Sequence, residues 1–267
     1  MPITTLNGTK LNYRIDNEGG SDTIVLINGL ADDLESWGYQ VPDFVEAGYR
    51  VLSFDNRGIG KSDRPAGPYT SRMMADDAKA LVDSLGITRF HLMGVSMGGM
   101  IAQEYALAYP DDLKSATLAC TYGVADAFCQ TMFAMWADMA RGLSVPFVMR
   151  DVALWAFTGA FFEERPSDAA AFAEALAGLD QSLDAYLAQL NVIQQHNALE
   201  RVKDLKMPVL VLAGEEDILI PVRLSKRLQS AIPGATWTTT PGGHACLWET
   251  PGPFNTAYLD YLKSLSN

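Results

Sequence analysis

The chain has 267 residues, of which 48% are hydrophobic, and a formal net charge of −12. This length and apolar content predict a globular protein with a large core, built as one α/β domain or as a domain with an inserted lid. The acidic balance disfavours nucleic acids and anionic membrane surfaces as partners. No apolar run approaches the length of a membrane span, and the first residues do not resemble a secretory signal, so we expect a cytoplasmic protein.

Cysteine and histidine are both scarce, with three of each in the chain. The odd number of cysteines, which lack metal-type spacing, argues against a disulfide framework and for a reducing compartment. So few histidines also disfavour a metal site built on imidazole. We therefore expect neither a metal nor a cofactor.

Short apolar runs alternate with helical stretches along the chain, which predicts a mostly parallel sheet covered by helices on both faces. Residues 10–15 alternate between apolar and polar side chains, as an antiparallel edge strand would. Later runs are nearly continuous in apolar residues, as buried central strands are, and lie at 23–27, 49–54, 90–95, 116–120 and 208–213. Helices are expected at 71–85, at 97–108 and from Thr250-Pro251 onward.

Residues 124–201 interrupt this alternation and contain no convincing strand. Apolar residues recur there at helical spacing, as in Met132, Met135, Trp136 and Met139 and again in Leu183, Tyr186, Leu187 and Leu190. We predict that 1–123 and 202–267 form the core, and that 124–201 is a helical lid inserted before the acid-bearing strand. A lid lines the cavity that it covers, so the candidate substrate-binding residues are Met132, Trp136, Trp155 and His196.

The strongest chemical signal is a G-x-S-x-G motif at 94–98, between an expected strand and an expected helix. In that setting the serine occupies a strained turn that raises its hydroxyl above the sheet edge, and small neighbours prevent clashes. We predict that Ser96 is a nucleophile. Its oxyanion would be stabilised by the backbone N–H groups of Met97, at the helix start, and of Leu30, on the loop after strand 23–27.

A serine hydroxyl needs a base within hydrogen-bond reach. His244 follows the sequence Pro-Gly-Gly on a loop that precedes the last expected helix, so small neighbours let its ring approach the serine. His91 falls within a strand, where a packed core role is expected, and His196 belongs to the lid. His244 is therefore the predicted base.

The base in turn needs a carboxylate that fixes its tautomer and stabilises its charged form. The loop after strand 208–213 offers Glu215, Glu216 and Asp217. Asp217 is favoured because the residues that follow it are apolar up to Pro221, whereas the two glutamates are expected to face solvent. Where a G-x-S-x-G serine lies between a strand and a helix, the acid and then the histidine are expected to follow it along the chain, and Ser96, Asp217 and His244 have this order.

Taken together, these segments make the chain resemble the α/β-hydrolase superfamily from Lys10 to Leu265. The matching segments are 28–30, 55–63, 94–100, 214–221 and Gly243-His244 with Glu249 and Pro251. The resemblance is nearest to small lidded esterases and lactonases, including 3-oxoadipate enol-lactonase-like proteins and cofactor-free haloperoxidases. Asn28 stands where the family usually has histidine. This difference puts in doubt how the loop that carries Leu30 packs. Ser96 argues against relatives with an aspartate nucleophile, such as haloalkane dehalogenases and epoxide hydrolases.

We predict a serine hydrolase that cleaves a small to medium, largely apolar ester or lactone through an acyl-enzyme, with a small molecule as its partner. Three alternatives remain open. A carbon–carbon bond hydrolase of a dienoate ring-cleavage product would need basic groups for the substrate carboxylate. A cofactor-free haloperoxidase or perhydrolase would share the triad, and a hydrolase-fold ligand receptor would turn over slowly. The residues do not indicate the physiological substrate or the oligomeric state.

Overall fold

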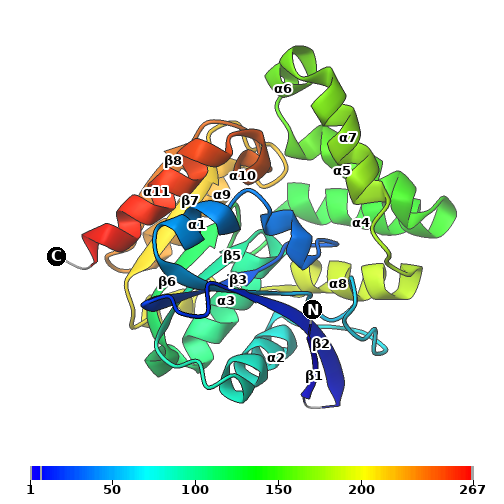
Figure 1. The fold of residues 1–267 in the computed structure, drawn as a ribbon. Coiled ribbons are helices and arrows are strands. Elements are labelled where there is room, and N and C mark those ends of the chain that lie inside the picture. Colours follow the sequence, from blue (N-terminus) through cyan, green and yellow to red (C-terminus); the bar gives the residue numbers. More distant parts are fainter. Residues whose placement is uncertain (1, 7, 266–267) are drawn as a thin grey trace.

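An eight-stranded sheet flanked by helices is the framework of the computed structural model, which describes residues 2–6 and 8–265 (Figure 1). The strands are β1 (Ile3–Leu6), β2 (Thr9–Asp16), β3 (Asp22–Ile27), β4 (Tyr49–Phe54), β5 (Phe90–Val95), β6 (Leu113–Ala119), β7 (Val209–Gly214) and β8 (Thr236–Thr240). Their order across the sheet is β1-β2-β4-β3-β5-β6-β7-β8. All pairs from β4 to β8 are parallel, as the alternation of strands and helices predicts.

The antiparallel edge differs from the prediction by one strand. β2 does pair antiparallel with β4, but it is not the edge, because β1 pairs with its other side from Ile3↔Asn12 to Leu6↔Thr9. β1 has four residues, none of them buried. So short a segment carries too few alternations to be separated from a loop by pattern alone.

Both faces of the sheet are buried, which explains why the central strands are almost continuously apolar. On β3, Ile24 and Leu26 pack into one core cluster, whereas Val25 and Ile27 pack into the cluster on the opposite face. The helices of the core are α1 (Val41–Glu46), α2 (Ser71–Ser84), α3 (Met97–Ala108), α9 (Val222–Ala231), α10 (Cys246–Glu249) and α11 (Pro251–Ser264). Three short 3₁₀ turns are η1 (Leu34–Trp37), η2 (Pro110–Asp112) and η3 (Val202–Asp204).

Five consecutive helices separate β6 from β7, and we call them the α4–α8 segment (residues 127–195). They are α4 (Ala127–Gly142), α5 (Val145–Ala156), α6 (Gly159–Glu164), α7 (Pro166–Ala177) and α8 (Leu183–Gln195). In Figure 1 they gather beside the sheet rather than on its two flanking layers. At the base of the segment, Val124 and Asn197 form an isolated bridge, and the Ala198 N–H donates to Gly123 O at 2.8 Å. Of the helices in the described residues, none has the length and apolarity needed to cross a membrane.

Candidate active site

Ser96 occupies the turn between β5 and α3 with φ 56° and ψ −119°. Positive φ is strained for a residue with a side chain, so neighbouring contacts must hold it. The Ser96 N–H donates to Ala119 O and the Thr121 hydroxyl donates to Ser96 O, both at 2.9 Å. The turn is also packed tightly, because a Cβ added at Gly98 would lie 2.1 Å from Ile27 O. The surrounding strands thus force the conformation that the motif predicts.

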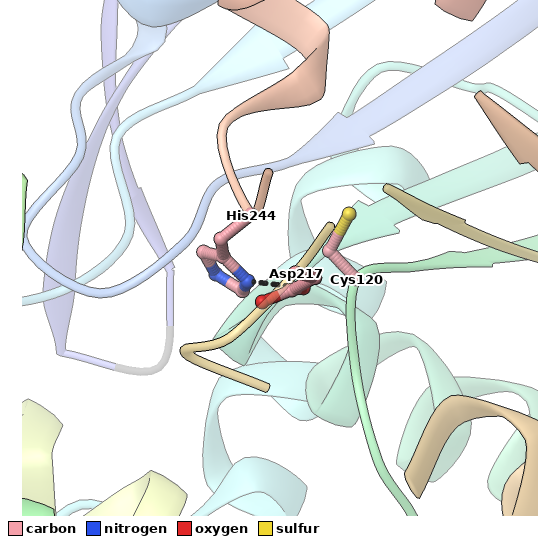
Figure 2. Close-up of side chains that lie close together, drawn as sticks. All are labelled: Cys120, Asp217 and His244. Atoms are coloured by element: carbon pink, nitrogen blue, oxygen red, sulfur yellow. Dashed lines mark hydrogen bonds and ion pairs between the residues drawn. The ribbon is translucent and has the colours of Figure 1, made fainter. Parts of the chain in front are cut away.

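His244 and Asp217 come from neighbouring loops and are joined by a hydrogen bond of 2.8 Å between Nδ1 and Oδ2 (Figure 2). The second oxygen of Asp217 accepts the Ile220 N–H at 2.8 Å, and the Asp217 side chain is fully buried. Glu215 and Glu216 are exposed, in agreement with the choice of Asp217 over them. With Nδ1 held by a carboxylate, Nε2 is the nitrogen of His244 that is left to act as a base.

Ser96 and His244 line one cavity of about 60 Å³, which we call the catalytic cavity. Since one water needs roughly 10–15 Å³ on this scale, the cavity holds only a few water-sized groups. Most of the lining is apolar and comes from both the core and the α4–α8 segment: Leu30, Val95, Met100, Phe133, Trp136, Met149, Val152, Ala156, Leu176, Ile193, Leu219, Ile220, Leu247 and Trp248. No lysine or arginine belongs to the lining among the described residues.

Of the four predicted substrate-binding residues, the structure places Trp136 in this lining. Met132 is buried in the core cluster instead. Trp155 is half-buried, and its indole N–H donates to Asp151 Oδ2, the same oxygen that accepts the indole N–H of Trp136. Helical spacing identified a buried face but could not separate the residues that reach the cavity from those that pack between helices.

His196 is buried outside the lining of the catalytic cavity. Its Nδ1 lies 3.0 Å from Ser71 Oγ and its Nε2 lies 3.2 Å from Gln103 Oε1. Burial, with a smaller effect of Arg201, lowers the pKa of His196 to about 3, so the ring is neutral. These contacts give His196 a packing role at the end of α8 rather than a place beside the serine.

The loop that follows β3 is held by Asn28, the residue that departs from the family pattern. Its side-chain amide donates to Asp33 O and to Ser36 Oγ, the latter at 2.8 Å, while Asn28 O accepts from Asn56 at 3.1 Å. The hydrogen bonds of Asn28 therefore hold this loop in place although the usual histidine is missing. The loop places Leu30 in the cavity lining, and Met97 is the first residue of α3, where N–H groups have no intrahelical acceptor.

Gln189 on α8 was not foreseen as part of this site. It is fully buried and its Oε1 accepts the Ala31 N–H at 3.0 Å, while its Nε2 donates to Arg57 O at 2.7 Å. Gln189 thus ties the α4–α8 segment to the loop of Leu30. The available signal was one amide on the apolar face of an expected helix, and a buried amide always needs partners.

Cys120 lies beside the His244–Asp217 pair, as Figure 2 shows, and one ligand atom of each of the three residues lies within 4.8 Å of the others. This geometry invites comparison with a metal site. However, the hydrogen bond with Cys246 and burial hold the pKa of the Cys120 thiol well above its ordinary value, whereas a metal needs the thiolate. The donor set therefore fits a carboxylate that orients the His244 ring better than it fits a metal.

Glu249 connects the His244 loop to the α4–α8 segment. Its Oε2 accepts the N–H groups of Gly243 and Thr158 at 3.0 and 3.3 Å, and its Oε1 accepts the Thr158 hydroxyl. A glutamine cannot satisfy these three donors equally, because one end of its amide donates. We expect Glu249→Gln to lower the free energy of unfolding by about 2–3 kcal/mol and to lower kcat, since Gly243 directly precedes His244.

Chemical denaturation and steady-state kinetics below the unfolding transition measure the two effects of Glu249→Gln separately. Glu164→Gln is the matched control, because Glu164 is an exposed carboxylate on α6 in the same segment. Equal stability and equal kcat in wild type and Glu249→Gln would show that this carboxylate does not position the loop.

Comparisons with known proteins agree with the fold. The family model described as "alpha/beta hydrolase fold" matches residues 22–251. The chain is 32% identical to "Putative non-heme bromoperoxidase BpoC" of Mycobacterium tuberculosis, over 96% of this chain and 99% of that protein. It is 27% identical to 3-oxoadipate enol-lactonase 2 of Acinetobacter baylyi, over 97% and 95% of the two chains. The crystal structure of the enol-lactonase from Burkholderia xenovorans superposes with a TM-score of 0.91 at 29% identity, covering 98% of this chain and all of that one. The chain belongs to the α/β-hydrolase fold family.

Proposed function

We propose that the protein hydrolyses a carboxylic ester or lactone through an acyl-enzyme on Ser96. In this mechanism the Ser96 hydroxyl attacks the carbonyl carbon while Nε2 of His244 takes its proton. Asp217 stabilises the charged imidazole, and His244 then returns the proton to the leaving alcohol. Water, deprotonated by the same histidine, releases the acid and restores the serine.

One observation carries this proposal. A serine held at positive φ at the N-terminus of a helix shares a cavity with a histidine whose Nδ1 is bound to a buried carboxylate. The proposed nucleophile thus faces the same cavity as the proposed base, whose ring is held by the proposed acid, and this arrangement supports covalent acyl transfer. The N–H groups of Met97 and Leu30 are the proposed oxyanion donors.

The α4–α8 segment is the proposed lid, since it supplies seven of the nineteen residues that line the catalytic cavity. The apolar lining and the small volume support a short, apolar group next to the scissile carbonyl. The carbon–carbon bond hydrolase alternative is less well supported, because such a substrate carries a carboxylate and the described lining holds no cationic side chain to receive it. The cytoplasmic location remains a prediction from the sequence.

A panel of p-nitrophenyl esters of graded acyl length, together with simple lactones, tests the proposal. We expect turnover with an optimum at short acyl chains, and an acyl adduct on the peptide that contains Ser96 when the reaction is quenched with acid and analysed by mass spectrometry. Ser96→Ala is the control and should show neither turnover nor adduct. Turnover without a Ser96 adduct would indicate another nucleophile, and no turnover on esters or lactones would contradict the proposal.

A further inference from the structure

Asp32 is a carboxyl group of the catalytic cavity that the mechanism above does not use. It lines the catalytic cavity together with Ser96 and His244, and it also lines a second cavity of about 270 Å³ between α7 and the loop that carries η1. Asp32 is only partly exposed. Within residues 2–6 and 8–265, its carboxyl group receives no hydrogen bond and forms no ion pair, so it is available to a ligand.

Gly29 brings this carboxyl close to the nucleophile. A Cβ added at Gly29 would lie 3.0 Å from Asp32 Oδ2 and 3.6 Å from Ser96 Cβ. The space left by the missing side chain is thus bordered by the acid on one side and by the serine on the other. Asp32, Leu176 and Trp248 line both cavities, so a substrate that reaches from Ser96 into the second cavity would lie beside Asp32.

The surroundings of Asp32 disfavour its ionised form. Burial, with the like charge of Asp33, raises the pKa of Asp32 to about 8. Asp33 lines the second cavity together with two further ionisable groups, Tyr39 and Glu35, and Glu35 is paired with Arg14 at 3.0 Å. His244 faces Asp32 across the catalytic cavity. The α4–α8 segment contributes only apolar and aromatic side chains to both linings. At neutral pH the carboxyl group therefore carries a proton and can donate a hydrogen bond.

We propose that Asp32 is a specificity-determining residue that donates a hydrogen bond to a second, uncharged oxygen of the substrate, on the part that runs from the scissile carbonyl toward the second cavity. The substrate class is then a neutral oxygenated ester or lactone. An enol-lactone of a dicarboxylic acid retains a free carboxylate, and neither cavity lining holds a lysine or arginine among the described residues to receive it. The proposal rests on ester or lactone hydrolysis at Ser96, and it narrows the substrate of that site.

Matched substrates test the hydrogen bond. We would compare a p-nitrophenyl alkanoate with its oxa analogue, in which an ether oxygen replaces one CH₂ beyond the carbon next to the carbonyl. The ratio of kcat/KM for the two esters should fall roughly 3- to 10-fold in Asp32→Leu, which has no donor, and should be largely retained in Asp32→Asn, which has one. Taking the ratio within each protein cancels general effects of the substitution.

The pH profile gives a second readout. Wild-type kcat/KM for the oxa ester should fall as pH rises through about 8, because Asp32 then loses its proton and can no longer donate a hydrogen bond. Its negative charge also opposes the negative charge that develops on the oxyanion. Asp32→Asn should lack this alkaline decline. Asp138→Asn, which removes an exposed carboxylate of α4, should retain it.

Folding offers a check that does not depend on activity. The pKa of Asp32 is raised in the folded state, whereas in the unfolded chain it has its ordinary value of 3.8. Between pH 3.8 and about 8 the folded protein therefore binds a proton that the unfolded chain releases, and the free energy of unfolding of the wild type falls as pH rises through this range. The unfolding temperature of Asp32→Asn relative to wild type should therefore increase between pH 5 and about pH 8. An unchanged substrate ratio in Asp32→Leu, together with an alkaline decline in Asp32→Asn, would overturn the proposal while Ser96-dependent turnover persists. Loss of the Ser96 requirement would instead overturn the proposed function.

Discussion

We expect replacement of Ser96 with alanine to lower kcat for ester hydrolysis by roughly 10⁴- to 10⁶-fold, and replacement of His244 with alanine to lower it by a similar factor. The two residues are expected to act together, because without the hydroxyl the base has no proton to take, and without the base the hydroxyl is not activated. The activity that remains would come from the proposed oxyanion donors, the N–H groups of Met97 and Leu30. Stopped-flow or long-time steady-state assays with a p-nitrophenyl ester measure the loss.

The double variant Ser96→Ala/His244→Ala distinguishes a working unit from two separate effects. We expect it to be scarcely slower than either single variant, because each substitution already disables the same step. Asp217→Asn should be less damaging than loss of His244, since the ring can still reach the serine in a less favourable tautomer. Multiplicative losses in the double variant would mean that Ser96 and His244 do not act in one step.

Gly98→Ala is expected to have the largest effect on stability. A Cβ at this position would lie 2.1 Å from Ile27 O and 2.7 Å from Asn28 O, and both are backbone atoms that cannot rotate away. Ile27 ends β3 in the middle of the sheet, and Asn28 begins the loop that carries Leu30. The clash must therefore move either α3 or that loop, at a cost of about 3 kcal/mol or more.

Thermal unfolding followed by circular dichroism tests this expectation, and the transition of Gly98→Ala should fall by about 6–12 °C. Gly142→Ala is the matched control, because Gly142 ends α4 and nothing lies within 4 Å of an added Cβ. That variant should unfold at or slightly above the wild-type temperature. Insoluble expression of Gly98→Ala alone would agree with the prediction, whereas equal unfolding of both variants would contradict it.

The sequence predicts much of this fold because local and tertiary signals agree. The run at 23–27 is apolar on both faces and is buried on both, and the glycines around Ser96 are needed where strand, turn and helix approach closely. Asp217 was chosen because the residues that follow it are apolar up to Pro221, and two of them, Leu219 and Ile220, are buried. In each case the residue pattern states directly which side chains lose contact with water.

Features that depend on contacts between distant segments could not be predicted in the same way. β1 forms only because β2 offers it a free edge, and no periodicity in four residues reveals that. Gln189 meets Ala31 from 158 positions away, and His196 meets Ser71 across 125, so neither partner is visible near either residue. Asp32 was passed over because a pair of aspartates in a loop looks like an exposed turn until the helices above it are known.

The carboxylate of Glu249 has a consequence for how substrate enters. Glu249 accepts hydrogen bonds from Thr158 and Gly243, and the Ala245 N–H donates to Ala156 O at 2.9 Å. These hydrogen bonds join the connection between α5 and α6 to the loop that carries His244. An outward movement of that connection would leave the buried Glu249 carboxylate without its Thr158 donors and would displace His244. If the α4–α8 segment opens to admit substrate, these hydrogen bonds predict that it stays fixed at Thr158 and that α7, which lines the second cavity, moves instead. A substrate that enters beside α7 would then contact Asp32, the proposed specificity-determining residue, before it reaches Ser96.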